Sequence, residues 1–182
     1  MRHLKIINSI LLIILLFLTT SCSNNSAMKP EDFKNKKPRL IIEEYLSGNV
    51  KAWGVLQNRS GKVTRQFSAD LNGSWDGKQL ILKEKFNWDD GEVQNREWKI
   101  NKIDEHNYEG TAGDVVGKAI GYSYGPAFKF EYVLLVPVKG KELKITFDDW
   151  IFKQDERVAI NRATMTKFGF KVAELTVVFV KD

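Results

Sequence analysis

Residues 79–103 read QLILKEKFNWDDGEVQNREWKINKI, and this stretch decides the fold. Apolar and polar side chains alternate through Gln79–Trp88 and again through Gln94–Ile103. Between the two runs lies Asp89-Asp90-Gly91, a sequence typical of a tight turn. Because alternation with a period of two is the pattern of a strand with one buried face, the stretch predicts an antiparallel hairpin.

Segments of the same kind recur along most of the chain, separated by turn sequences such as Asn72-Gly73, Asp76-Gly77 and Lys139-Gly140. These other segments are Leu40–Leu46, Lys51–Gln57, Val63–Leu71, Tyr108–Ala112, Val116–Tyr124, Ala127–Val138, Glu142–Phe152, Arg157–Thr164 and Leu175–Val180. Short connections favour antiparallel pairing of sequence neighbours, and closure of the sheet removes exposed edges. We therefore predict an all-β fold, an up-and-down antiparallel barrel of about ten strands with little helix.

The N-terminal residues 1–21 are typical of a secretion signal. A basic start (Arg2–Lys5) is followed by the unbroken apolar run Ile10–Leu18 and by small residues before Cys22. This arrangement resembles a bacterial lipoprotein signal, in which the cysteine after the cleavage site carries diacylglycerol. We predict lipidation at Cys22, and the alternative is an ordinary cleaved signal with an incidental cysteine. Ser23 in place of aspartate favours, by the same resemblance, the periplasmic face of a Gram-negative outer membrane.

The sequence divides into three parts. Residues 1–21 are the predicted cleaved signal, residues 22–38 are polar and lysine-rich and predict a lipid-anchored tether, and residues 39–182 form the predicted barrel domain. The chain has one cysteine, which excludes intrachain disulfides and cysteine zinc sites. Its net charge is only +5 and the two signs are interleaved, so nucleic acid is not an expected partner.

Five charged residues fall on the apolar face of a predicted strand. They are Arg65, Glu84, Arg96, Asp149 and Arg162. Because an isolated buried charge costs several kcal/mol, each should be paired, hydrated or in contact with a ligand. Sequence-adjacent strands predict the pairs Glu84–Arg96 and Asp149–Arg162. Arg65 is then left as the unpaired cation.

These charges allow two interpretations. An apolar cavity with a few polar groups suits a small amphiphile, and an unpaired arginine suits an anionic head group such as a carboxylate. The alternative is a structural ion network that fixes strand register in a filled barrel. The tryptophans are more typical of core or barrel-end packing, but Trp53 and Trp98 complete the set of candidate ligand contacts.

Residues 40–182 resemble a known family. The motifs that carry the resemblance include Lys51-Ala52-Trp53-Gly54, Gly73-Ser74-Trp75-Asp76-Gly77, Asp148-Asp149-Trp150, and Ile160-Asn161-Arg162-Ala163-Thr164-Met165. The family consists of uncharacterised proteobacterial lipoproteins that have a domain of unknown function and a lipocalin-like fold. It has no established activity. Its genes tend to lie near a cyclopropane-fatty-acid synthase, which implies a link to membrane lipid metabolism.

The sequence does not predict a catalytic or metal site. His106 alone would have to serve any triad or metal site after signal cleavage, and no nearby serine is placed as a nucleophile. The run Asp89–Glu92 offers too few alternating oxygen ligands for calcium. Asp148 and Asp149 are adjacent in a strand and point to opposite faces, so their carboxylates do not converge. We therefore expect no enzymatic activity, cofactor or metal.

Two functions from different classes remain. The first is a membrane-anchored periplasmic lipoprotein that binds a fatty acid or another anionic amphiphile, such as a phospholipid, in a barrel cavity. The second is a structural or assembly lipoprotein of the envelope, with a filled barrel that binds a protein partner. A ligand that can be extracted from the purified domain distinguishes the two.

Overall fold

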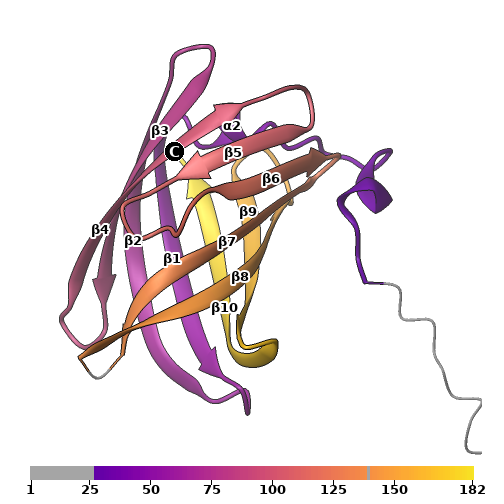
Figure 1. The fold of residues 1–182 in the computed structure, drawn as a ribbon. Helices are drawn as coiled ribbons and strands as arrows, with labels where there is room; N and C mark the ends of the chain where they lie inside the picture. The colour runs from indigo at the N-terminus through magenta and orange to yellow at the C-terminus, as the bar shows by residue number, and fades with distance from the viewer. Residues whose placement is uncertain (1–26, 139) are drawn as a thin grey trace, which may run out of the picture.

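The protein is described here from a computed structural model that covers residues 27–138 and 140–182, so the predicted signal and Cys22 lie outside the described residues. Ten strands form a closed antiparallel barrel in which each strand pairs with its sequence neighbours and β1 pairs with β10 (Figure 1). The strands are β1 (Gly48–Asn58), β2 (Val63–Trp75), β3 (Gln79–Trp88), β4 (Val93–Lys102), β5 (Asn107–Thr111), β6 (Ala119–Tyr124), β7 (Ala127–Val138), β8 (Lys141–Lys153), β9 (Val158–Lys167) and β10 (Phe170–Lys181). The predicted all-β, up-and-down barrel is confirmed. Residues 27–182 contain all ten described strands and the closing pair β1–β10, so we expect this part of the chain to fold on its own.

The two ends of the barrel differ. The turns β1–β2, β3–β4, β7–β8 and β9–β10 surround one end, which we call the mouth and which lies at the bottom of Figure 1. The turns β2–β3, β4–β5, β6–β7 and β8–β9 surround the opposite end, which we call the closed end, and the β5–β6 connection lies in the barrel wall. Buried side chains, many of them aromatic, fill much of the space between the two ends.

A short helix, α2 (Ile42–Tyr45), plugs the closed end. The prediction of a strand over Leu40–Leu46 is therefore wrong. The buried side chains of this segment recur at helical rather than strand spacing, which lets Ile42 and Leu46 both point into the barrel. The plug is held by the Tyr45 hydroxyl, which donates to the Arg157 carbonyl at 2.9 Å, and by Lys181 Nζ, which donates to three carbonyls around α2.

The predicted tether is partly packed against the barrel. Its residues Pro30–Phe33 form a 3-10 helix, η1, beside the barrel wall (Figure 1). The Phe33 ring lies 6.0 Å from the Trp150 ring and 5.5 Å from the Phe152 ring. These contacts cover Trp150, which faces outward from β8 yet is buried. No helix in residues 27–138 and 140–182 is long and apolar enough to span a bilayer.

The barrel wall has a seam between β4 and β7. The two strands between them are short, so β4 pairs with β5 only over Lys99–Lys102, and β7 pairs with β6 only over Ala127–Glu131. Residues 112–118, which we call the seam loop, cover the rest of this gap. The Leu135 amide donates to the Asp114 carbonyl at 2.9 Å, and this bond attaches the loop to β7.

Candidate functional site

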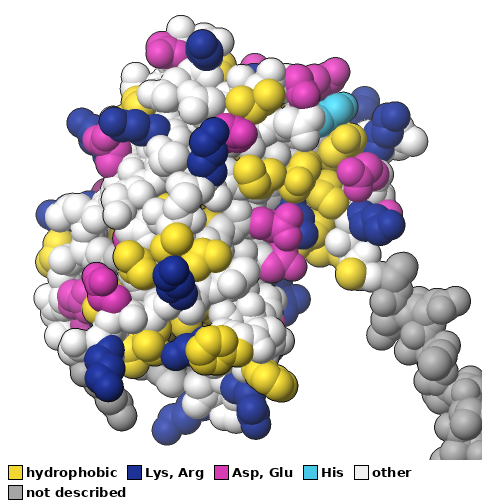
Figure 2. Space-filling view, viewed as in Figure 1, with side chains coloured by type: hydrophobic (Ala, Val, Ile, Leu, Met, Phe, Trp, Pro, Cys, Tyr) yellow, Lys and Arg dark blue, Asp and Glu magenta, His cyan; other side chains and the backbone are white. Residues whose placement is uncertain are grey.

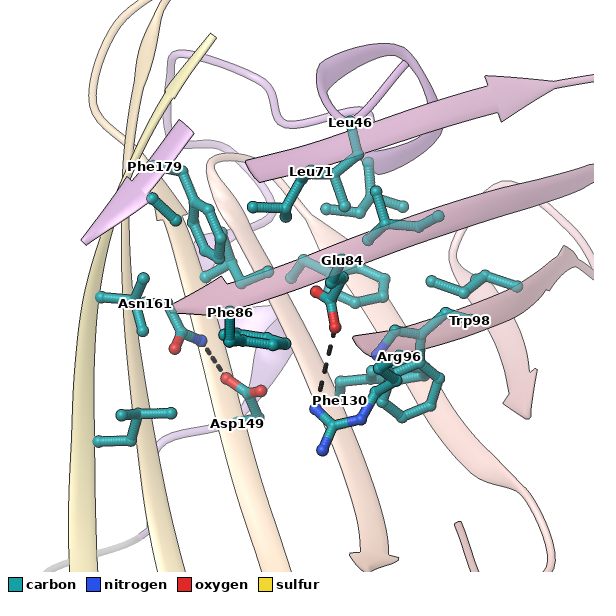
Figure 3. A pocket seen from close by; sticks show the side chains of 18 of the residues that line it. Leu46, Leu71, Glu84, Phe86, Arg96, Trp98, Phe130, Asp149, Asn161 and Phe179 are labelled. Atoms are coloured by element: carbon teal, nitrogen blue, oxygen red, sulfur yellow. Dashed lines mark hydrogen bonds and ion pairs between the residues drawn. The ribbon is translucent and has the colours of Figure 1, made fainter. Parts of the chain in front are cut away.

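A cavity runs through the barrel from α2 toward the mouth. Its inner part has a volume of about 100 Å³ and is lined mainly by apolar and aromatic side chains (Figure 3). Its outer part has a volume of about 200 Å³ and lies toward the mouth and the seam. Phe67, Phe86 and Arg96 line both parts, so the two parts adjoin. The space accepts a slender apolar molecule, and its size is at the lower end for ligand pockets.

Glu84 and Arg96 face each other where the two parts of the cavity meet. They are direct cross-strand partners on β3 and β4, and both follow the inward phase of their strands. Arg96 Nη1 lies 3.8 Å from Glu84 Oε2. On its other side Arg96 donates from Nη2 and Nε to the carboxylate of Asp114 in the seam loop, at 2.7 and 3.1 Å. The predicted pair Glu84–Arg96 is confirmed, and Asp114 extends it.

The negative charge of the Glu84 carboxyl is only partly balanced by its neighbours. Burial raises its pKa to about 7, although the positive charge of Arg96 acts in the opposite direction. Its Oε2 atom is buried and has no hydrogen-bond partner among the described residues. At neutral pH this carboxyl therefore lies close to its point of half-ionisation.

A second polar group faces the cavity from the opposite wall. Asp149 on β8 accepts a hydrogen bond from the Tyr132 hydroxyl at 2.8 Å and another from Asn161 Nδ2. Burial raises the pKa of Asp149 to about 6, and the hydrogen bond from Tyr132 lowers it in part. Burial, together with the charge of Asp149, also raises the pKa of Tyr132 well above its usual value. Tyr132 is therefore a hydrogen-bond donor at any physiological pH.

Carboxylates outnumber cations in this interior. Among the described residues that line the inner cavity, Glu84 and Asp149 face a single cation, Arg96. The outer cavity adds two carboxylates, Asp114 and Glu92, and one cation, Arg65, so four carboxylates and two arginines line the two parts together. Arg96 Nε and Nη2, the Tyr132 hydroxyl and Asn161 Nδ2 already donate to carboxylates. Among the described residues, Glu84 Oε2 has no donor and remains free to accept. The arrangement fits a ligand that donates a hydrogen bond better than one that carries a second full negative charge.

Arg162 is not in the cavity, so the predicted pair Asp149–Arg162 is wrong. The side chain of Arg162 is 65% exposed on the outer face of β9 and pairs with Glu174 at 2.9 Å. The inward residues around Arg162 are small: Ala159, Asn161 and Ala163, with Met165 following only toward the mouth. In this part of the strand the larger apolar residues lie on the outer face, where Ile160 is partly covered by its cross-strand neighbours. A phase assigned from the larger apolar residues was therefore off by one position.

Two further predicted contacts need correction. Arg65 does face inward at the mouth, but it is not an unpaired cation: it donates to Asp90 at 2.7 Å and to Glu92 at 2.9 Å. Its guanidinium also lies 4.0 Å from the centre of the Trp88 ring. Trp53 lies on the outer face of β1 and is 50% exposed. Trp98, by contrast, is buried and lines the inner cavity.

Several polar partners in the cavity could not be predicted from the sequence. Asp114 lies in a loop, and Tyr132 and Asn161 are uncharged, so a search for charges on apolar faces passes over them. The closed end holds another missed group, in which buried Glu43 on α2 accepts hydrogen bonds from Lys102 and Tyr108. These last three residues hold the plug in place.

His106 packs against its neighbours on the barrel. Its ring stacks on Tyr124 with a centroid distance of 4.1 Å, and its Nδ1 lies 2.8 Å from the Ser123 carbonyl oxygen. Within the described ranges, no three His, Cys, Asp or Glu side chains are grouped as a metal site requires.

A protein-family model matches residues 16–181, and its description is "Protein of unknown function (DUF3833)". The chain belongs to the DUF3833 family. The resemblance to a family of unknown function is thereby confirmed. No curated protein sequence matches this DUF3833 chain.

Solved structures share the fold of this DUF3833 protein. The S-type phycobiliprotein lyase CPES from Guillardia theta is similar to it with a TM-score of 0.57 and 10% identity, over 77% of this chain and 90% of that one. A protein of unknown function from the DUF3598 family of Nostoc punctiforme is similar with a TM-score of 0.57 and 14% identity, over 81% of this chain and 51% of that one. At such identities the likeness establishes the fold alone, and it supports the predicted lipocalin-like barrel.

Proposed function

We propose that this protein is a lipid-anchored binding protein that holds a single-chain amphiphile, such as a fatty acid, inside its barrel. The observation that carries the proposal is Glu84 Oε2, a buried acceptor that has no donor in the described part of the chain and lines a largely apolar cavity. Leaving a buried acceptor unsatisfied is unfavourable, so a ligand that donates a hydrogen bond there gains affinity. The proposed role is binding and not catalysis.

The pair Glu84–Arg96 sets the chemistry of the ligand's polar end. Arg96 is already bonded to Asp114, and the interior has an excess of carboxylates, so an ionised carboxylate is a poor fit. A protonated carboxyl or a hydroxyl can donate to Glu84 Oε2 and accept from Arg96. We therefore expect a fatty acid to bind in its neutral form and a fatty alcohol to bind comparably.

The apolar chain of the ligand has a matching path. From the pair Glu84–Arg96, the outer cavity leads toward the mouth between Phe86, Met165 and Leu175. Burial of each methylene there contributes about 0.8 kcal/mol. The chain length that the cavity accepts is therefore a measurable property of the protein.

The sequence supports a place for this barrel at a membrane. With an acyl anchor at Cys22, residues 23–29 would separate the membrane from the packed residues that begin at Pro30. An extended chain of this length spans at most about 25 Å. The barrel is then held close to a source of amphiphiles, and we propose the periplasmic face of the outer membrane.

Mass spectrometry of organic extracts from purified residues 27–182 tests the proposal. We expect an amphiphile at a stoichiometry near one per chain. Added fatty acid and fatty alcohol of equal chain length should both bind to delipidated protein, and acid binding should weaken as the pH rises above about 7, where Glu84 ionises.

Glu84→Leu removes the free acceptor and should weaken the binding of both ligands about tenfold or more. Glu97→Leu is the matched control because Glu97 lies next to Arg96 in the same strand but is exposed on the outer face. Equal binding by the two variants would contradict the proposed head-group contact.

A filled barrel with a protein partner is the second candidate. It is favoured by the small inner cavity, about 100 Å³, and by close aromatic contacts such as that between Trp98 and Phe130 at 5.1 Å. This candidate requires extracts without ligand, no binding of added amphiphile, and a specific partner after crosslinking in whole cells.

A further inference from the structure

The mouth carries an exposed apolar and basic surface on three adjacent hairpins. Phe168 and Phe170, at the β9–β10 turn, are 89% and 74% exposed. Figure 2 shows apolar side chains among Lys and Arg side chains at this lower end of the molecule. We define the mouth patch as Arg59, Lys62, Val63, Val138, Lys141, Lys167, Phe168, Phe170 and Lys171. Its four apolar side chains are between 40% and 89% exposed in the barrel itself.

Phe168 does not stabilise the barrel, for two reasons. Its φ of 52° lies in the left-handed region, which an aromatic residue adopts only with strain. Its ring also contributes nothing to the core, because its one close contact of note is with Lys167 Nζ, 5.3 Å from the ring centre. Strain of this kind in an exposed residue points to a role outside the folding of the barrel.

Charge distinguishes this side of the mouth from the other. The described residues of the three hairpins, 58–63, 138–142 and 167–174, carry five basic side chains against the acidic Glu142 and Glu174. Glu174 is bonded to Lys171 and Arg162. The acidic residues of the β3–β4 turn lie on the opposite side of the mouth, and Arg65 pairs with two of them. The mouth patch is therefore a net positive surface with aromatic residues at its tip.

We propose that the mouth patch docks on the surface of a bilayer that contains anionic lipids. Exposed aromatic rings insert at the boundary between head groups and acyl chains, and lysines beside them are attracted to anionic head groups. A second copy of the chain is a poorer occupant, because two such patches repel each other. This inference goes beyond the proposed ligand binding, and it stands whether or not the cavity holds an amphiphile.

Vesicle sedimentation with purified residues 27–182, which lack the predicted anchor, tests the inference. One set of vesicles is phosphatidylcholine alone, and the other contains about 30% phosphatidylglycerol as the anionic lipid. We expect strong partitioning onto the anionic vesicles only, weakened by added salt because exposed charges are screened. Failure of the protein to bind the anionic vesicles overturns the inference.

Phe168→Asn separates docking from folding. Asparagine tolerates the left-handed conformation, so the variant should melt at the same or a higher temperature than the wild-type protein. Its partitioning onto anionic vesicles should fall about tenfold, and further when combined with Phe170→Thr. Ile103→Asn, which replaces another exposed apolar residue away from the mouth, is the control and should bind as the wild type does.

Three results decide the matter. Loss of partitioning in Phe168→Asn with unchanged melting supports docking through the mouth. Wild-type partitioning in Phe168→Asn, or equal loss in Ile103→Asn, overturns it. Concentration-dependent dimerisation in sedimentation velocity that Phe168→Asn abolishes also overturns it, since a second copy would then cover the patch.

Discussion

Glu84, at the scale of a single residue, combines a buried position with an incomplete set of partners. Arg96 Nη1 lies 3.8 Å from Glu84 Oε2, which is too long for a hydrogen bond, and no other described residue donates to this atom. Arg96 makes its closer bonds to Asp114. Ionisation of Glu84 therefore lowers the free energy of unfolding of the protein and also affects ligand binding.

Glu84→Gln should reduce the dependence of stability on pH. The pKa of Glu84 is about 7 in the folded state against 4.5 for an ordinary glutamate. The folded state thus holds the proton more tightly, and the resulting stabilisation is complete below about pH 4.5 and is lost as the pH rises through about 7. Asp149, with a pKa raised to about 6, acts in the same direction at lower pH.

Urea unfolding at pH 5 and pH 8 provides the measurement for Glu84→Gln. Between these values, the wild-type protein should lose on the order of 1–3 kcal/mol of unfolding free energy relative to the variant. Glu97→Gln, at an exposed position, should keep the wild-type pH dependence. An identical pH dependence in Glu84→Gln and the wild type would show that Glu84 is not the responsible group.

Which charged residues face inward could be predicted where large apolar side chains share their face. This held for Arg65, Glu84, Arg96 and Asp149. It failed for Arg162 because β9 places alanines and Asn161 inside and isoleucine outside. Packing explains the inversion, since a barrel filled by aromatic rings from one wall leaves room only for small residues on the other. A pattern within one strand carries no information about the opposite wall.

At the scale of an element, α2 and the strand beneath it fit together through a glycine. Gly73 on β2 lies directly under the Leu46 carbonyl, and a Cβ atom added at Gly73 would sit 1.9 Å from that oxygen. The helix can therefore enter the barrel only because this position has no side chain. A four-residue helix gives no periodic signal of useful length, which is why the sequence predicted a strand there.

Gly73→Ala should displace the plug and lower the free energy of unfolding by about 1–3 kcal/mol, through overpacking. Thermal unfolding measures the loss, and fluorescence of an apolar dye at the closed end reports the opening. Gly113→Ala is the control, because no atom lies within 4 Å of a Cβ at that position. Equal melting temperatures for the two variants would mean that α2 tolerates displacement.

For the whole molecule, the barrel wall is not uniform. β1 and β10 pair over nine residues, from Val50–Lys181 to Asn58–Ala173, whereas β4 and β5 pair over four. Strand number and short turns were enough to predict a closed barrel from the sequence. The seam could not be predicted, because the lengths of β5 and β6 depend on which neighbouring strands their backbone groups form hydrogen bonds with.

Amide hydrogen exchange should reflect this asymmetry. Amides of the β1–β10 pair should exchange only through global unfolding, and those of the seam loop should exchange through local opening at a faster rate. Arg96→Met, which releases Asp114, should accelerate amide exchange at Leu135. Exchange in the β1–β10 pair should change only as much as the variant's free energy of global unfolding changes. Uniform exchange across the barrel would contradict a locally weak seam.

The separation of the two barrel ends has a consequence for engineering. The start of β1, the end of β10 and the plug all lie at the closed end, so the four hairpin turns of the mouth carry neither chain terminus. Loops on a rigid scaffold tolerate changes in length and sequence far better than the strands that support them. Libraries of grafted hairpins could therefore diversify the entrance while the closed end of the barrel stays constant, which makes this barrel a scaffold for selecting new binders.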